Sequence, residues 1–471
     1  KNMVNKGLAI EVLNTLTETG ADFAELFYED TYSKNFQFEG SKVDEMTQDN
    51  INGVGLRLFK DLRSVYGYTN DLSKKGLLSL AHNLASSLDG KRVIDKVSSF
   101  SKVKIKKVNK PVDLLKDVPN EEIIEYVRKG VNKITSYDPR IVRVIAGFSI
   151  KDTSTVIYNT KGQVINNFKE YGRVFFNSIS SENGNIQSTF DGPGSQNGWK
   201  FFKEEIDIEA LALKNASANI KMLNAKECPA GKFPVVIANG WGGVIFHEAC
   251  GHQLEATSVA KGLSVFSGKM GEMIANPIVS AYDDGRIPNV WGSIDVDDEG
   301  VASTNNCLIK NGKLVGYMVD SFNARRMGCE PTGCARRQSY KFEPTSRMTN
   351  TYIAAGKSTP EEIIANTKLG IYAANFGGGS VDPSTGDFNF GCTEAYLIKD
   401  GKIDQPLRGA TLVGNAREIL KHIDMVGNDV AFGVGMCGSS SGSIPVQVGQ
   451  PTIRLDEITV GGRGGSIDEF K

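Results

Sequence analysis

The segment Phe246–His252 holds two of the four histidines in this 471-residue chain. His247 is followed directly by Glu248, and His252 comes five residues after His247. Neutral imidazoles bind divalent transition metals, and a carboxylate beside such a metal is placed to take a proton from water. These residue types in this order predict a metal-dependent hydrolytic site, with the histidines as metal ligands and the glutamate as general base.

The five-residue spacing of the histidines constrains the local backbone. In the common helical zinc signature the two histidines are four residues apart and share one face of the helix. At 3.6 residues per turn, a separation of five leaves His247 and His252 about 140° apart, so a regular helix cannot direct both imidazoles at one metal. A locally widened turn would correct this, and Gly251 tolerates such a distortion. The alternative is that the histidines and Glu248 are unrelated helix positions, with one imidazole capping the helix or packing in the core.

A catalytic zinc site needs a third protein ligand and keeps one position open for water. The sequence offers several donors, and their spacing does not decide among them. The candidates are Cys250, Glu255, Asp297, Asp298 and any distant cysteine that the fold brings close.

The elements that must position this segment follow from hydrophobic periodicity. In the first half of the chain, helical patterns alternate with strand patterns, which indicates an α+β fold. We expect helices over residues 4–16, 72–88, 121–134 and 207–222, and strands within residues 21–69 and 140–176.

A domain boundary is expected within residues 226–234, where two prolines and a glycine interrupt the periodicity. The chain is longer than the size at which a single core usually stops growing. We therefore expect an N-terminal α+β domain over residues 1–225 and a C-terminal catalytic domain over residues 226–471. The second domain is predicted to be mainly β and Gly-rich, with a hairpin turn at Asp400–Gly401. It carries the histidine segment on a helix that starts near Gly240.

Composition and charge exclude several classes of protein. Hydrophobic residues make up 40 % and charged residues 23 % of the chain, as in ordinary globular proteins. The formal net charge of -1 provides no general attraction to nucleic acids or anionic membranes, so we expect neither as a partner. The lack of a long apolar stretch and of an N-terminal leader pattern favours the cytoplasm. The seven scattered cysteines are expected to be reduced thiols.

The second half of the chain also resembles a known family. The segments Phe246–His252 and Ser264–Gly268 are similar to the active-site region of the TldD side of the TldD/PmbA family of metallopeptidases. Further similarity lies in Asp382–Phe388, Ala395–Ile398, Gly435–Gly438, Pro445–Pro451 and Thr459–Gly462. The N-terminal half matches the family in its α+β character.

The resemblance implies a zinc peptidase that hydrolyses peptide bonds in unfolded or extended polypeptides. It implies that His247, His252 and Cys437 hold Zn²⁺ and that Glu248 is the general base. It also implies a dimer, formed with a second copy of the chain or with a PmbA-like subunit (also called TldE) that lacks the histidine motif. Ser439–Gly442 departs from the family pattern, where a charged residue is expected, and this puts the shape of the turn after Cys437 in doubt.

Two further features have competing interpretations. The Gly-rich segments around Phe376–Gly379 and Gly433–Gly435 either present free backbone groups to an extended substrate or serve tight turns. The arginines around the loop Cys329–Cys334 could bind a carboxylate or nucleic acid, but clusters of this size favour a solvated surface. These arginines are Arg325, Arg326, Arg336 and Arg337.

The alternative to a peptidase is a non-catalytic regulatory binding protein. The older naming of the resembled family is associated with such a role, as a DNA gyrase modulator. A regulator should tolerate Glu248→Gln, whereas a peptidase should lose turnover.

Overall fold

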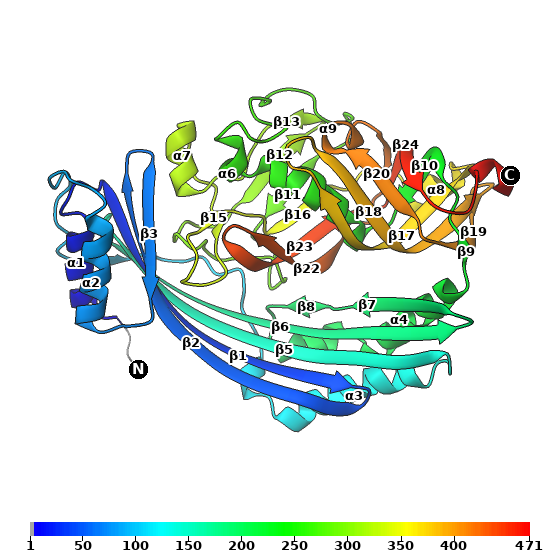
Figure 1. The fold of residues 1–471 in the computed structure, drawn as a ribbon, viewed down its shortest axis with the longest axis horizontal. Coiled ribbons are helices and arrows are strands. Elements are labelled where there is room, and N and C mark those ends of the chain that lie inside the picture. Colours follow the sequence, from blue (N-terminus) through cyan, green and yellow to red (C-terminus); the bar gives the residue numbers. More distant parts are fainter. Residues whose placement is uncertain (1–3) are drawn as a thin grey trace.

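The computed structural model describes residues 4–471, and the first half of the chain forms a long, curved sheet (Figure 1). Its strands are β1 (Phe23–Glu39), β2 (Lys42–Lys60), β3 (Arg63–Thr69), β4 (Ser101–Lys102), β5 (Ile141–Asn159), β6 (Gln163–Glu182), β7 (Asn185–Asp191) and β8 (Gly194–Ser195). They pair in the order β3-β2-β1-β5-β6, and β4, β7 and β8 also pair with β6. The strand patterns seen in the sequence therefore belong to one sheet.

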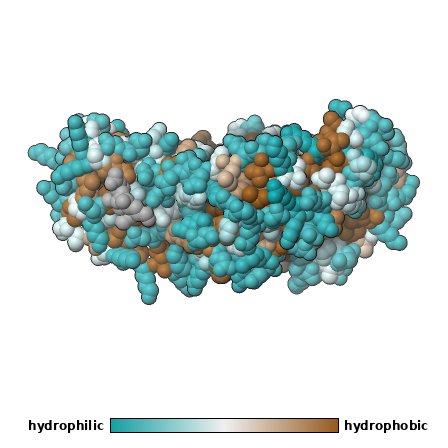
Figure 2. Space-filling view, turned by 90° about the horizontal axis from the view of Figure 1, so that it is seen from below, coloured by the Kyte–Doolittle hydropathy of each residue, from teal (hydrophilic) through white to brown (hydrophobic). Residues whose placement is uncertain are grey.

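Helices cover one face and one end of this sheet. α3 (Asn120–Thr135) and α4 (Ile208–Leu223) pack on the face that carries Phe176, whereas α1 (Lys6–Leu16) and α2 (Lys74–Ala85) pack together near β1 and β3. All four helices lie where hydrophobic periodicity predicted them. Seen from below, the molecule is mostly hydrophilic, with hydrophobic side chains in separate patches (Figure 2).

The second half of the chain forms a closed sheet and a smaller open one. Its strands are β9 (Lys226–Glu227), β10 (Gly231–Ile237), β11 (Ala281–Asp284), β12 (Asn305–Lys310), β13 (Lys313–Leu314), β14 (Ala335–Arg336), β15 (Thr345–Ser346), β16 (Asn350–Ile353), β17 (Leu369–Val381), β18 (Asp387–Lys399), β19 (Lys402–Arg408), β20 (Thr411–Asn415), β21 (Ile423–Val426), β22 (Ala431–Ser439), β23 (Gly442–Gln450) and β24 (Ile453–Gly461). The order β17-β10-β24-β20-β18 closes because β18 pairs back to β17. The open sheet has the order β13-β12-β11-β16-β23-β22, with β22 at its edge.

The chain is thus a mixed α+β protein whose second half is rich in strands. Asp400 and Gly401 connect β18 to β19 as the predicted hairpin turn. The helices of this half are short: α5 (Val244–Phe246), α6 (Ala256–Val259), α7 (Ser321–Met327), α8 (Pro360–Ala365) and α9 (Ala416–Ile419). Across residues 4–471, no helix combines the length and the apolar character that crossing a membrane requires.

Buried charges join the first sheet to the second half of the chain. Arg57 on β2 contacts Glu25 at 2.9 Å and Glu299 at 3.1 Å, and its side chain is 1 % exposed. Arg337 also contacts Glu25, at 3.3 Å. Arg336 and Arg337 are both buried. The prediction of a solvated arginine surface is therefore wrong for these two residues, because partners from the first sheet and the surrounding loops cover them.

Candidate metal centre

The segment with the two histidines is a helical stretch whose geometry changes along its length. A 3-10 turn at Gly240–Gly243 leads into α5, then a π-helical turn covers His247–Gly251 and a 3-10 turn covers His252–Leu254. In the π-helical turn the His252 N–H donates to the His247 carbonyl, five residues earlier. The two ring centroids lie 5.1 Å apart. The widened turn that the spacing required is therefore present, and it brings the imidazoles together.

Gly251 has a different role from the one expected. Its φ and ψ angles are −59° and −49°, which any residue adopts in a helix. A Cβ atom at this position would lie 2.3 Å from the Met348 sulfur. The glycine is therefore needed for close packing against Met348 and not for backbone distortion.

Cys437 on β22 meets the two imidazoles from a distant part of the chain. Its Sγ lies 3.4 Å from the Nε2 atom of His247 and 3.4 Å from that of His252, and the three donor atoms all lie within 4.8 Å of one another. Tetrahedral zinc bonds of about 2.3 Å to sulfur and 2.0–2.1 Å to nitrogen would place such ligand atoms about 3.6 Å apart. The donors and their spacing therefore fit a metal ion, and three is the number of protein ligands that catalytic zinc sites use.

The other donors considered for the third ligand lie elsewhere. The Cys250 thiol is buried and faces a backbone carbonyl of α9 at 3.9 Å. Asp297 and Asp298 accept backbone N–H groups in the buried junction with the first sheet. Within residues 4–471, Cys437 is the donor that completes a group of three with the two imidazoles.

Glu255, also considered as a ligand, contacts His252 instead. Its Oε1 atom lies 2.8 Å from His252 Nδ1, which leaves the Nε2 atom of that ring facing Cys437. A carboxylate on the outer nitrogen of a metal-binding histidine fixes the tautomer and the orientation of the ring. This role was not predicted from the sequence, although the three-residue spacing between His252 and Glu255 is a signal for such a contact.

Glu248 lies beside both imidazoles. Its carboxylate oxygens are 3.6 Å from His247 Nε2 and 3.8 Å from His252 Nε2, and 40 % of its side chain is exposed. These distances are longer than hydrogen bonds, so the carboxylate is free to contact water or a substrate.

Burial and neighbouring charges shift the protonation of these groups. Burial, and then the nearby His252, lowers the pKa of His247 well below its usual value, so this imidazole is neutral, as a metal ligand must be. Burial also acts to lower the pKa of His252, but Glu255 and then Cys437 outweigh it, and the net shift is upward. Burial raises the pKa of Glu248, although His252 opposes the shift. The raised pKa brings the carboxyl closer to the range in which a general base works at neutral pH.

The turn after Cys437 is a tight hairpin that a distant arginine supports. β22 and β23 pair without a register shift, and Gly442 after the turn has a φ of +91°, which favours glycine. Arg347 donates from Nη1 to the Ser441 hydroxyl and the Gly442 carbonyl, both at 2.8 Å, and from Nη2 to the Cys437 carbonyl at 2.6 Å. The positive charge at this turn therefore comes from a residue 90 positions before Cys437 and not from the turn itself.

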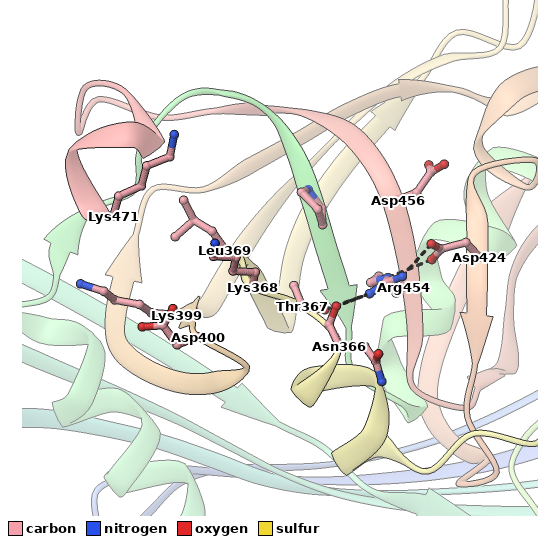
Figure 3. Close-up of a pocket in the computed structure, with 11 residues that line it drawn as sticks. Asn366, Thr367, Lys368, Leu369, Lys399, Asp400, Asp424, Arg454, Asp456 and Lys471 are labelled. Carbon is pink, nitrogen blue, oxygen red and sulfur yellow. Dashed lines mark hydrogen bonds and ion pairs between the residues drawn. The ribbon is translucent and has the colours of Figure 1, made fainter.

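A cleft of about 620 Å³, drawn in Figure 3, lies between residues of the second half of the chain. Its walls carry charges of both signs, including the ion pair between Arg454 and Asp424. The residues around that pair include Lys368, Lys399, Asp400 and Asp456. Since neither the two histidines nor Cys437 lines this cleft, its size does not mark the metal centre.

Comparison with known sequences assigns the chain to a family. Residues 230–462 match the PmbA/TldA metallopeptidase C-terminal domain, residues 24–88 match domain 1, and residues 113–223 match the central domain. A metalloprotease TldD homolog of Haemophilus influenzae is 36 % identical over 462 residues, which cover 96 % of this chain and 95 % of that protein. The chain belongs to the PmbA/TldD family of metallopeptidases. The family resemblance read from the motifs is therefore confirmed, and so is the assignment as a metallopeptidase.

The chain is also similar to a second named relative and to solved structures. A zinc metalloprotease TldD homolog of Saccharolobus solfataricus is 31 % identical over 259 residues, or 54 % of this chain and 57 % of that protein. The structure of a proposed DNA gyrase modulator from Thermotoga maritima has a TM-score of 0.79 at 21 % identity and covers 97 % of this chain and 100 % of that one. TldE from Thermococcus kodakarensis has a TM-score of 0.78 at 18 % identity and covers 97 % and 99 %. At these identities the two structures show a shared fold.

Proposed function

We propose that this metallopeptidase uses zinc, with His247, His252 and Cys437 as the metal ligands and Glu248 as the general base. The observation that carries the proposal is the convergence of two imidazoles and one thiol at separations that suit zinc. Nitrogen and sulfur donors favour zinc over hard cations such as magnesium and calcium. The name of the S. solfataricus relative, a zinc metalloprotease, supports the same metal.

The side chains around the three proposed ligands have different roles in peptide hydrolysis. When bound, zinc would supply Lewis-acid polarisation of the scissile carbonyl and of the attacking water. Glu248 accepts a proton from that water at a carboxylate oxygen and then donates it to the nitrogen of the leaving amine. Glu255 keeps the Nε2 atom of His252 directed at the cluster. The 40 % exposure of Glu248 allows the proton transfer to take place at the surface that a substrate reaches.

We propose an extended polypeptide as the substrate, paired with the outer edge of β22. β22 is the last strand of its sheet, and Pro445 lies opposite Met436. Because proline has no N–H, this pair suits a position without inter-strand hydrogen bonds, so the N–H and C=O of Met436 point away from β23. Met436 precedes Cys437, and a strand bound there would run beside the proposed metal site. Main-chain pairing of this kind accepts many sequences.

Side-chain contacts limit where such a strand fits on β22. The Val434 carbonyl faces the same edge as that of Met436 and accepts a hydrogen bond from Arg173 at 3.5 Å. The Gly435 carbonyl faces β23 and also accepts a hydrogen bond from Trp291, at 2.9 Å. These carbonyls are therefore less available to a substrate. The end of β22 that carries Met436 is the part that we propose for pairing.

The glycines noted in the sequence divide into two groups. A Cβ at Gly433 would lie 2.7 Å from a ring carbon of Trp241, and one at Gly435 would lie 3.0 Å from the same ring. These two glycines serve close packing. A Cβ at Gly378 would meet nothing within 4 Å, so Gly378 leaves bare backbone that an extended chain can approach.

We propose that the active form is a dimer, with either a second copy of the chain or a PmbA-like (TldE-like) subunit. The fold shared with TldE from T. kodakarensis supports a pairing between TldD-type and TldE-type chains. A partner that covers the approach to β22 would admit extended chains and exclude folded domains. The dimer would therefore select unfolded substrates, and the edge of β22 would bind their main chain.

The alternative of a non-catalytic regulator draws on the T. maritima structure, a proposed DNA gyrase modulator with the same fold. Metal analysis and peptide hydrolysis separate the two functions. About one zinc per chain, together with hydrolysis that Glu248→Gln abolishes, supports the peptidase. A metal-free wild-type protein, or hydrolysis that Glu248→Gln leaves unchanged, contradicts it.

A further inference from the structure

Arg347 is a fully buried guanidinium beside the proposed metal site. Its side chain is 0 % exposed, and its hydrogen bonds go to the hairpin that carries Cys437. The acceptors are two backbone carbonyls and one hydroxyl, none of which carries a charge. The Nε atom has no hydrogen-bond partner among residues 4–471. A buried cation with neutral contacts is costly unless an opposite charge lies nearby.

The loaded metal site would provide that opposite charge. Its protein groups are the Cys437 thiolate and the carboxylates of Glu248 and Glu255, with three negative charges between them. Zinc brings two positive charges, and Arg347 brings the third. The site as a whole is therefore neutral only when Arg347 is included, which reduces the cost of burying its parts.

Arg347 also contacts both strands of the hairpin that carries Cys437. The two histidines lie on a helical segment within the core, whereas Cys437 lies on an edge strand that pairs with β23 alone. Arg347 lies between β15 and β16. Its hydrogen bonds to the Cys437 carbonyl and to residues on the other side of the β22–β23 turn connect the hairpin to this part of the chain. Its own N–H donates to the Cys334 carbonyl at 3.0 Å, so this anchor is itself held in place.

We propose that Arg347 is a positioning residue for the metal site, which holds the Cys437 sulfur opposite the two imidazoles and balances the charge of the loaded site. This inference rests on the proposed function, because it requires a metal bound by Cys437. Outer partners of metal ligands typically change metal affinity by about 10–100-fold when they are removed.

The test measures the zinc dissociation constant of the full chain for the wild type, Arg347→Met, Arg347→Lys and a control. The control is Arg408→Met, because Arg408 on β19 also donates to two backbone carbonyls, those of Leu223 at 2.9 Å and Ile186 at 3.4 Å, and these contacts involve neither the hairpin nor the proposed ligands. We expect zinc binding about 10–100-fold weaker in Arg347→Met and an intermediate loss in Arg347→Lys, which keeps the charge but not the three contacts. Arg408→Met should bind zinc like the wild type.

A second readout reports on the sulfur itself. In the cobalt-substituted protein, the thiolate-to-cobalt charge-transfer absorption should weaken or shift in Arg347→Met and stay unchanged in Arg408→Met. Wild-type zinc affinity and an unchanged cobalt spectrum in Arg347→Met would overturn the inference. Equal loss of zinc in both methionine variants would also overturn it, since that would reflect general destabilisation. If Arg347→Met does not fold, the zinc affinity of Arg347→Lys, compared with that of the wild type, tests the inference instead. If Cys437→Ser keeps wild-type zinc affinity, the proposed ligand set is wrong, whatever Arg347→Met does. Failure of the proposed function is therefore distinguishable from failure of this inference.

Discussion

The His252 N–H donates to the carbonyl of His247, one residue further back than in an α-helix. This one relationship makes a five-residue histidine spacing compatible with a single metal site. It also moves Glu248, between the two histidines, to within 3.6 Å and 3.8 Å of their Nε2 atoms. The local backbone therefore sets both the ligand geometry and the place of the proposed base.

The assignment of Cys437 as third ligand predicts the behaviour of Cys437→Ser. A serine hydroxyl does not ionise as a thiol does and is a poor zinc ligand, so zinc binding should weaken by more than the about 10–100-fold seen for outer partners. The measurement is zinc affinity by competition with a chelator. Cys228→Ser is the matched control, because that thiol is buried outside both the donor group and the histidine turn. Full zinc affinity in Cys437→Ser would remove Cys437 from the site.

If Glu248 is the general base and not a metal ligand, its substitution should affect catalysis but not metal binding. Glu248→Gln keeps the size of the side chain but removes its ability to accept a proton. Zinc content should stay at the wild-type level while the hydrolysis rate falls by roughly 10²–10⁴. Glu272→Gln, at an exposed residue that pairs with Lys269, should leave the rate unchanged. Wild-type hydrolysis by Glu248→Gln would require another base or another function.

The contact between Glu255 and His252 predicts a positioning effect. In Glu255→Gln the partner of Nδ1 can donate as well as accept, so the ring tautomer is no longer fixed. Zinc affinity or activity should fall by about 10–100-fold. Glu18→Gln serves as the control, because Glu18 makes the same kind of contact, at 3.1 Å, with the exposed ring of His82. If both variants behave like the wild type, Glu255 has no role in the site.

Close packing at Gly251 predicts a loss of stability in Gly251→Ala. The added methyl group would lie 2.3 Å from the Met348 sulfur, and overpacking of a core typically costs about 1–3 kcal/mol. Gly378→Ala should cost far less, since its methyl group would meet nothing within 4 Å. Urea unfolding of the two variants measures the difference in the free energy of unfolding. Equal stability of the two would show that the helix moves aside at Gly251 without cost.

The sequence predicted the elements of the first half because their apolar residues recur at short range. α1, α2, α3 and α4 each begin and end within three residues of the predicted ranges. The paired histidines and the required widened turn were also local features. The proposed boundary between residues 225 and 226 remains a prediction.

Contacts between residues far apart in the chain could not be predicted from local sequence patterns. Cys437 lies 185 residues from His252, and local spacing did not select it from the other donors; only the family resemblance did. The charge cluster at Arg337 indicated a solvated surface, but Arg337 is buried, and its partner Glu25 lies 312 residues away in the first sheet. Arg347 gave no local signal, because its contacts are with a hairpin about 90 residues further on.

A further prediction concerns the substrate edge of β22. Met436→Pro removes the one N–H that we propose to pair with an extended substrate, while its side chain lies on the exposed part of the strand. The loss of one main-chain hydrogen bond is worth about 0.5–1.5 kcal/mol, so kcat/KM should fall by about 2–10-fold with zinc content unchanged. Met436→Ala keeps the N–H and should retain wild-type kinetics. Equal kinetics of the two variants would place the substrate elsewhere.

The same assay tests selectivity for unfolded chains and the need for a partner. One substrate is offered in two matched forms, folded with its disulfides intact and unfolded after reduction and alkylation, to the protein alone and with a TldE-like chain. We expect cleavage of the unfolded form and little of the folded one, because only an extended backbone can pair with the free edge beside Cys437. Mass in solution, measured on the same samples, should show that the active species is a dimer. A monomer that cleaves both forms equally well would exclude both the dimer and the strand-pairing mode, since neither would then be needed to explain activity.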